Sequence, residues 1–281
     1  MNRHYDRSRI QSRRRFQTPR CKDMTVCIAA VYKDRDDGEH DRGIVLVTDW
    51  QKTDMQTSLT SLGHKFASLA PYIAILGAGD LSYFGDLVGR ADKKLRNKES
   101  VTVAEAANAY LESEIDWRNE YRENHVLSTY NLNWDSYFEK LENDKLPEAF
   151  FTEINQGLRA LPMPCSADVI IAGIDYPNEE NQRASIIKIK DGIKDNCGME
   201  GFAVIGEGDT IATAEFGYAF YTRFWERPQT MFLCYLAKKR SEAIASVGTS
   251  TNLSNITAKD GVRAVSKSLK GISKNSIIAG G

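Results

Sequence analysis

Four runs of sequence decide the fold: MTVCIAAVY (24–32), GIVLVTDWQKT (43–53), HKFASL (64–69) and YIAILGAG (72–79). Each is rich in apolar or β-branched residues, and polar or glycine-containing turns separate them, a pattern typical of antiparallel strands joined as hairpins. We therefore predict two hairpins at the start of the chain. Thr25 stands at the head of the first run, Asp49 closes the second and Lys65 opens the third, so these three residues are candidates for an active site.

The remaining sequence alternates between helical and strand patterns. Apolar residues recur at helical spacing from Leu81 to Leu95, and Asp80 before them suits an N-cap. Because strands, helices, strands, helices and strands follow in that order, we predict one α+β domain over residues 24–281, with two antiparallel sheets packed together and helices outside. Residues 117–165, aromatic and charged, form an insert. The other predicted helices lie at 102–115, 148–161, 210–221 and 229–246, and the other predicted strands at 166–174, 184–189, 201–205, 251–257 and 262–265.

Composition excludes two classes of partner. The chain has 281 residues, 42% of them hydrophobic, and a mean hydropathy of -0.43, as an ordinary globular protein has. No apolar run approaches the roughly 18 to 20 residues of a membrane span, so we expect no membrane partner. Of the 37 basic and 38 acidic residues, eight basic and two acidic ones lie within residues 1–23, which leaves the rest negative. The net negative charge of residues 24–281 argues against nucleic-acid binding.

Cysteine and histidine usage bears on the compartment and on metal binding. The five cysteines are odd in number and form no C-x-x-C pair, and no apolar signal segment precedes them. This favours a reducing cytoplasm over a disulfide framework. The four histidines show neither H-x-x-x-H nor H-E-x-x-H spacing, so we expect no zinc site.

Residues 1–23 are rich in arginine and show no apolar periodicity. Three interpretations stay open: a disordered basic tail, a targeting segment or propeptide, and an upstream start codon that is not used. Met24 directly precedes the first strand pattern, which favours the unused start.

Thr25 gains a second functional group if Met24 is removed, because its α-amine is then free. The unperturbed pKa of such an amine is about 7.7 to 8.0, against about 10.4 for lysine, so the amine can accept the hydroxyl proton near neutral pH. A threonine with its own amine is a recognised activated nucleophile. Lys65 beside the hydroxyl would supply positive charge, and Asp49 would orient and neutralise that lysine. The N–H of Gly79, at a strand-to-helix turn, would donate to an oxyanion.

Several segments together carry a family resemblance. These are Thr25, GIVLVTDWQKT (43–53), Lys65, GAG (77–79), ADVIIAGID (167–175), FAVIGEG (202–208) and VGTSTNL (247–253). They resemble the proteasome β-type subunits and their bacterial proteasome-like relatives, which are N-terminal-nucleophile threonine hydrolases. The similarity covers residues 24–95 and 166–265. It implies a four-layer α-β-β-α sandwich, a peptide or unfolded-protein substrate, no cofactor, and a homo-oligomeric ring fed by an ATPase unfoldase.

By position, the resemblance implies roles for single residues. Thr25 is the implied nucleophile and general base, Asp49 and Lys65 form the charge pair beside it, and Gly79 supplies the oxyanion N–H. Thr53 is the implied backbone clamp for an extended peptide held as an added strand. The resemblance also implies a specificity pocket for a substrate side chain, in which Gly77 would leave room and Lys52 would favour acidic groups. That pocket consists of Lys52, Gly63, Ala67, Gly77 and Leu81.

Departures from the family pattern concern the groups that support the nucleophile. Glu207 stands where the family usually has a serine, and its carboxylate near the amine would raise the pKa of the amine. The family's aspartate and serine near the last helix have no clear counterparts, so Ser246, Thr249 and Ser250 are the polar candidates for supporting groups. A methionine precedes the threonine where proteasome propeptides usually end in glycine, which suits methionine removal better than self-cleavage.

The sequence therefore predicts a cytoplasmic threonine peptidase or amide hydrolase. Thr25 would attack the amide, form an acyl-enzyme ester and release it by water with the amine as base. Two alternatives stay open. One is a catalytically inactive scaffold subunit that keeps the fold, with Thr25 buried behind an uncleaved tail. The other is a small-molecule amidase in which the 117–165 insert covers the pocket.

Overall fold

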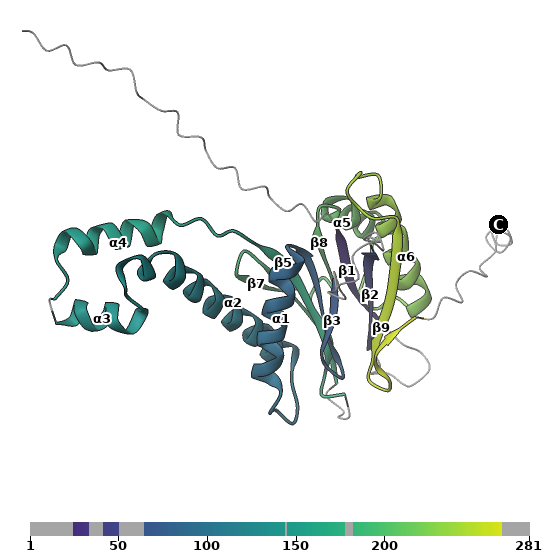
Figure 1. Cartoon of the computed structure of the whole chain (residues 1–281). Coiled ribbons are helices and arrows are strands. Elements are labelled where there is room, and N and C mark those ends of the chain that lie inside the picture. The colour runs from purple at the N-terminus through teal and green to yellow at the C-terminus, as the bar shows by residue number, and fades with distance from the viewer. Residues whose placement is uncertain (1–24, 34–41, 51–64, 144, 178–181, 266–281) are drawn as a thin grey trace, which may run out of the picture.

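The computed structural model describes residues 25–33, 42–50, 65–143, 145–177 and 182–265, and it has an α+β architecture (Figure 1). The described part contains two five-stranded sheets and six α-helices. Every strand pairing within the two sheets is antiparallel. The predicted α+β class and the two antiparallel sheets are thus confirmed.

In the first sheet β1 (Val26–Lys33), which begins directly after Thr25, is an interior strand. β1 is antiparallel to β2 (Arg42–Trp50) on one side and to β8 (Phe202–Gly206) on the other. Thr25 is therefore held at the end of a strand that is hydrogen-bonded on both sides. Beyond β2 the sheet continues with β9 (Ser250–Thr257) and β10 (Gly261–Ala264).

The second sheet begins with the predicted hairpin of β3 (Phe66–Ala70) and β4 (Ile73–Gly79), immediately after Lys65. β5 (Ala167–Asp175) pairs with β4, and β6 (Arg183–Lys190) pairs with β5. The edge strand β7 (Ile193–Asn196) is missing from the sequence-based prediction, because its residues are all exposed and give no apolar alternation.

One hydrophobic core lies between the two sheets. Successive side chains of a strand point to opposite faces, and in β1 Cys27, Ala29 and Val31 face this core. They pack with residues of the second sheet such as Leu76 and Ile170. The alternate residues from Val26 to Tyr32 are buried against helices. Burial on both faces explains why β1 is apolar without interruption.

Helices cover the outer face of each sheet (Figure 1). α1 (Leu81–Leu95) and α2 (Val103–His125) pack on the second sheet. α5 (Asp209–Tyr218) and α6 (Arg227–Ser241) pack on the first. Asp80 is the N-cap of α1, as predicted, and its carboxylate accepts a hydrogen bond from the N–H of Tyr83 at 3.0 Å. None of the helices in the described ranges is long and apolar enough to cross a membrane.

Three helix ends differ from the sequence-based prediction. α2 continues to His125 rather than ending near residue 115. α5 ends at Tyr218 rather than residue 221, and α6 ends at Ser241 rather than residue 246. The segment 242–249 consists of turns and irregular backbone. Its peptide groups are therefore available to bind side chains instead of completing a helix.

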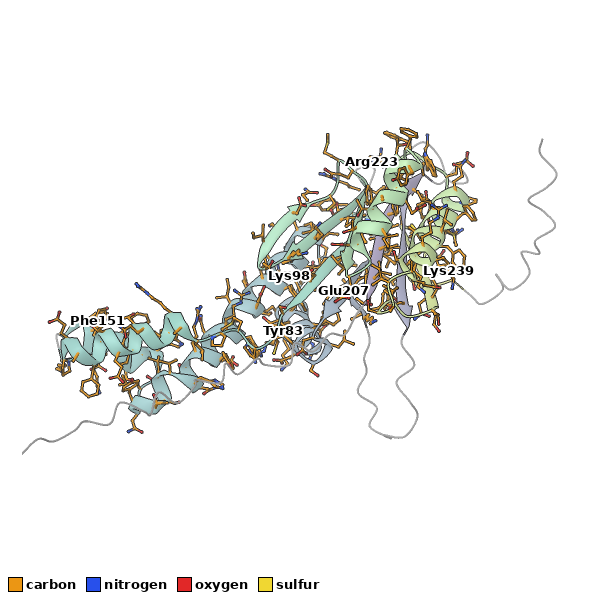
Figure 2. All side chains as sticks on the ribbon, turned by 90° about the horizontal axis from the view of Figure 1, so that it is seen from above. Tyr83, Lys98, Phe151, Glu207, Arg223 and Lys239 are labelled. Carbon is orange, nitrogen blue, oxygen red and sulfur yellow. The ribbon has the colours of Figure 1, made fainter. Side chains whose placement is uncertain are left out.

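Residues 126–161 of the predicted insert 117–165 form a helical arm, whereas residues 117–125 continue α2. Figure 1 shows the arm extending away from the two sheets, and Figure 2 shows Phe151 of the arm far from Glu207 beside the first sheet. The arm has a small core of its own, made by Val126, Leu127, Leu132, Tyr137 and Ile154. Its elements are a short 3-10 helix (Leu127–Tyr130), α3 (Trp134–Glu142) and α4 (Glu148–Ala160), of which only α4 is predicted from the sequence.

Candidate functional site

The three residues singled out at strand ends meet in one buried cluster. Asp49 Oδ1 accepts hydrogen bonds from Thr25 Oγ1 and from Lys65 Nζ, the latter at 2.9 Å. The side chains of Lys65 and Asp49 are 6% and 0% exposed, and Thr25 is 1% exposed. A carboxylate and an ammonium ion can be buried at this depth only because they neutralise and hydrogen-bond each other.

Backbone topology explains how residues far apart in the sequence reach this cluster. The register that pairs Cys27 with Thr48 places the start of β1 beside the end of β2, which brings Thr25 next to Asp49. Lys65 comes from the other sheet, where its carbonyl accepts a hydrogen bond from the N–H of Gly77 at 2.9 Å. The ion pair between Lys65 and Asp49 therefore joins the two sheets at one end.

A backbone group completes the environment of Asp49. The N–H of Gly248, in the turn segment between α6 and β9, donates to Asp49 Oδ2 at 2.9 Å. The described residues thus give the carboxylate three donors, with Thr25 and Lys65 on one oxygen and Gly248 on the other. Asp49 is held in one orientation and presents a fixed negative charge to the threonine hydroxyl.

A glycine allows the backbone of Thr25 to lie where it does. Gly206, at the end of β8, has a φ of +95°, which side-chain-bearing residues rarely adopt. A Cβ at this position would come within 2.2 Å of the carbonyl oxygen of Thr25. Close approach of the two backbones therefore depends on glycine.

Cys27 lies near the cluster but is not suited to be its nucleophile. Its Sγ donates a weak hydrogen bond to the carbonyl of Gly77 at 3.5 Å. Burial, followed by the negative charge of Asp49, raises the pKa of the Cys27 thiol to about 12. Because the thiolate is the reactive form of cysteine, this thiol is inert at neutral pH, in agreement with the core role that the sequence indicates.

Two of the candidate supporting residues contact each other. Ser246 Oγ donates a hydrogen bond to Glu207 Oε2 at 2.9 Å. Thr249 and Ser250 are exposed. Thr251, which the sequence does not single out, pairs with Asp49 across β9 and β2. Its hydroxyl oxygen is buried and has no hydrogen-bond partner among the described residues, and only the strand register could have identified it.

Gly79, the predicted oxyanion donor, lies at the end of β4 with a φ of +111°. A Cβ there would come within 2.5 Å of the carbonyl oxygen of Ser166, so this position also requires glycine. The next residue, Asp80, donates its N–H to the same carbonyl at 3.0 Å. The strand-to-helix turn expected at this position is confirmed.

The residues of the implied specificity pocket are only partly described. Lys52, Gly63 and the implied clamp Thr53 lie outside the described residues. Ala67 and Leu81 are half-buried. A Cβ at Gly77 would come within 2.5 Å of the Phe84 ring, so glycine is needed there for the packing of Phe84. The role of Gly77 in a pocket stays a prediction.

The described residues contain no group of three or more His, Cys, Asp or Glu side chains that could hold a metal ion. A scan of protein-family models finds no match to this chain, and a search of curated proteins finds none either. The chemistry of the site therefore has to be argued from its geometry. A threonine hydroxyl that bonds a carboxylate, with an ammonium on the same oxygen, is an arrangement that can orient and activate a nucleophile.

Proposed function

We propose that this protein is a threonine-type peptidase or amide hydrolase, with Thr25 as the nucleophile once residues 1–24 are removed. The observation that carries the proposal is the buried cluster in which Thr25 and Lys65 both bind Asp49 Oδ1. The substrate class follows the resemblance to proteasome β-type subunits, namely peptides or unfolded proteins.

The four-layer α-β-β-α sandwich of that family is part of the proposal. It is supported by a core shared between the two sheets and by helices α1 and α2 on one outer face and α5 and α6 on the other. We place the protein in the cytoplasm, as a homo-oligomer that an ATPase unfoldase can supply with substrate. These statements extend the resemblance and are open to direct measurement.

In the proposed mechanism the α-amine of Thr25 accepts the hydroxyl proton, and Oγ1 attacks the substrate carbonyl carbon. The ammonium of Lys65 stabilises negative charge near the nucleophile, and Asp49 holds both groups in place. The Gly79 N–H is the proposed donor to the oxyanion. The amine then gives its proton to the leaving nitrogen, and water hydrolyses the resulting ester with the amine again as base.

A second candidate function is an inactive scaffold subunit with the same fold. Thr25 is only 1% exposed in the full chain, which favours this alternative for any form that keeps residues 1–24. The contact between Ser246 and Glu207 also favours it, since a carboxylate occupies a position where the family usually has a serine.

The intact mass and N-terminal sequence of the protein from its native host distinguish these two functions. A chain that begins at Thr25 supports the hydrolase, and a chain that begins at Met1 or Met24 supports the scaffold. Peptide and amide hydrolysis by the chain beginning at Thr25 is the second measurement. Thr25→Ser keeps a hydroxyl and should retain activity, whereas Thr25→Ala should abolish it. Equal hydrolysis by both variants would reject the threonine mechanism.

A further inference from the structure

Lys238 in α6 is a buried lysine for which the proposed mechanism gives no role. Its side chain is 0% exposed, although it belongs to a run of three basic residues on one helix. Burial lowers the pKa of its ammonium, while the carboxylate of Glu242 acts in the opposite direction. Fully buried lysines are rare and costly, so the contacts of this one call for an explanation.

The ammonium of Lys238 binds the turn segment that follows its own helix. Nζ donates to the carbonyl oxygen of Gly248 at 2.6 Å and to Glu242 Oε1. Gly248 is the residue whose N–H binds Asp49 Oδ2 at 2.9 Å. The same glycine is therefore held through its carbonyl by Lys238 and holds Asp49 through its N–H.

The hydrogen bond from Gly248 determines which oxygen of Asp49 faces Thr25 and Lys65. With Oδ2 bound by Gly248, Oδ1 is the oxygen that meets Thr25 and Lys65. Turn bonds between backbone groups hold the segment up to Val247, but none of those found among the described residues involves Gly248 itself. A side chain that anchors Gly248 therefore influences the orientation of Asp49 through a single residue.

The neighbouring lysine provides a comparison within the same helix. Lys239, labelled in Figure 2, also donates to Glu242 Oε1, at 2.8 Å, and binds the carbonyl of Thr249 at 3.1 Å. Its side chain is 35% exposed. Both lysines thus anchor the same turn segment, but only Lys238 reaches Gly248 in the contacts that the structure describes.

We propose that Lys238 is a positioning residue for the Thr25 site, which fixes Gly248 so that the glycine N–H orients Asp49. The effect on hydrolysis rests on the proposed function, whereas the effect on Gly248 does not. The two can therefore be tested separately.

The first test measures the amide proton resonance of Gly248 by NMR in full-length protein labelled with ¹⁵N-glycine. An amide bound to a carboxylate has a strongly downfield proton resonance, and Gly248→Ala assigns that resonance by its loss. Lys238→Met keeps the length of the side chain and removes its donors and charge, so the Gly248 resonance should move upfield. Lys239→Met is the matched comparison and should move the resonance less, because Lys239 binds the carbonyl of Thr249 and not that of Gly248. An unchanged Gly248 resonance in folded Lys238→Met protein would overturn the proposal.

The second test needs no substitution at position 238, so it holds even if methionine there impairs folding. The charged groups that act on Lys238 are Glu242, Lys239 and Asp49. Raising the pH through the lowered pKa of Lys238 should move the Gly248 amide resonance in parallel with the ¹³Cε resonance of Lys238. Titration of Lys238 without any response of Gly248 would overturn the proposal.

The third test is kinetic and uses the chain that begins at Thr25. Misplacement of a catalytic constellation from a distant site can cost up to about 100-fold in rate. Lys238→Met should therefore lower kcat by a factor of this order with little change in KM. Lys239→Met should lower kcat less, because Lys239 makes no hydrogen bond to Gly248 among those that the structure describes. If the wild type hydrolyses its substrate and Lys238→Met has the same kcat, the positioning role is rejected. No hydrolysis by the wild type would reject the proposed function, while the amide measurements would still decide the role of Lys238.

Discussion

The carbonyl oxygen of Thr25 lies so close to Gly206 that a Cβ on the glycine would be 2.2 Å from it. Gly206→Ala should therefore push the start of β1 away from β8 and force a left-handed φ on alanine. Strain of this kind costs on the order of 1–3 kcal/mol, and the free energy of unfolding should fall by at least that amount in urea titrations.

Gly85 in α1 is the matched control for this substitution. A Cβ at Gly85 would meet no atom within 4 Å. Gly85→Ala should raise the free energy of unfolding by roughly 0.5–1 kcal/mol, because alanine is the better helix former. If Gly206→Ala were as stable as the wild type, the close approach of Gly206 and Thr25 would be refuted.

The ion pair between Lys65 and Asp49 should be strongly coupled. Lys65→Met leaves a buried carboxylate without its counter-charge, and Asp49→Asn leaves a buried ammonium, each at a cost of about 3–5 kcal/mol. The double variant removes both charges and should lose clearly less than the sum of the two single losses. Urea unfolding of the four proteins measures this coupling.

An exposed ion pair serves as the reference for the double-variant cycle of Lys65 and Asp49. Arg96 and Asp92 form an ion pair on α1 with side chains 69% and 45% exposed. Arg96→Met should change the free energy of unfolding by less than about 0.5 kcal/mol, since exposed pairs contribute little. Strict additivity in the Lys65 and Asp49 cycle would mean that the two charges do not interact in solution.

Much of the fold follows from local sequence signals. β1 and β4 are predictable because they are short apolar runs next to turns, and α1 because apolar spacing follows a good N-cap, Asp80. α3 is not predicted, because aromatic and charged residues obscure its periodicity. Its capping box of Asn133 and Ser136 was a usable signal. β7 gives no signal, since its residues are exposed on a sheet edge.

The candidate site is predictable only where side-chain identity carries the chemistry. Thr25, Asp49 and Lys65 can be selected because their types and positions at strand ends suit a nucleophile and a charge pair. Gly248 acts through its backbone N–H, which every residue except proline has, so no sequence pattern identifies it. Lys238 lies in a basic run typical of a solvated helix face, and tertiary packing alone buries it.

Stability in acid should depend on the start of α2. Glu105 closes a capping box with Thr102 and accepts a hydrogen bond from Lys98 at 2.8 Å. The Lys98 ammonium, followed by the donors of Thr102, lowers the pKa of Glu105 to about 2. The unfolded value is about 4.3, so the ionised carboxylate stabilises the fold fully above that pH. This stabilisation is lost as the pH falls through about 2.

Urea unfolding between pH 5 and pH 2 measures this dependence. Glu105→Gln should lose stability less steeply with falling pH than the wild type, and the difference should shrink in high salt because the side chain is exposed. Identical slopes in the two proteins would show that the ionised capping box does not stabilise α2.

The interior position of β1 ties the Thr25 site to the pairing of β1 with both of its neighbours. A strand paired on both sides and buried on both faces opens less readily than an edge strand, so we expect the strand that follows Thr25 to be among the last to open. The arm has a small core of its own, so we predict that it unfolds separately from the two sheets. On heating, the arm should then melt while Thr25, Asp49 and Lys65 stay together, and the proposed hydrolysis, if measured, would report on the two sheets and not on the arm.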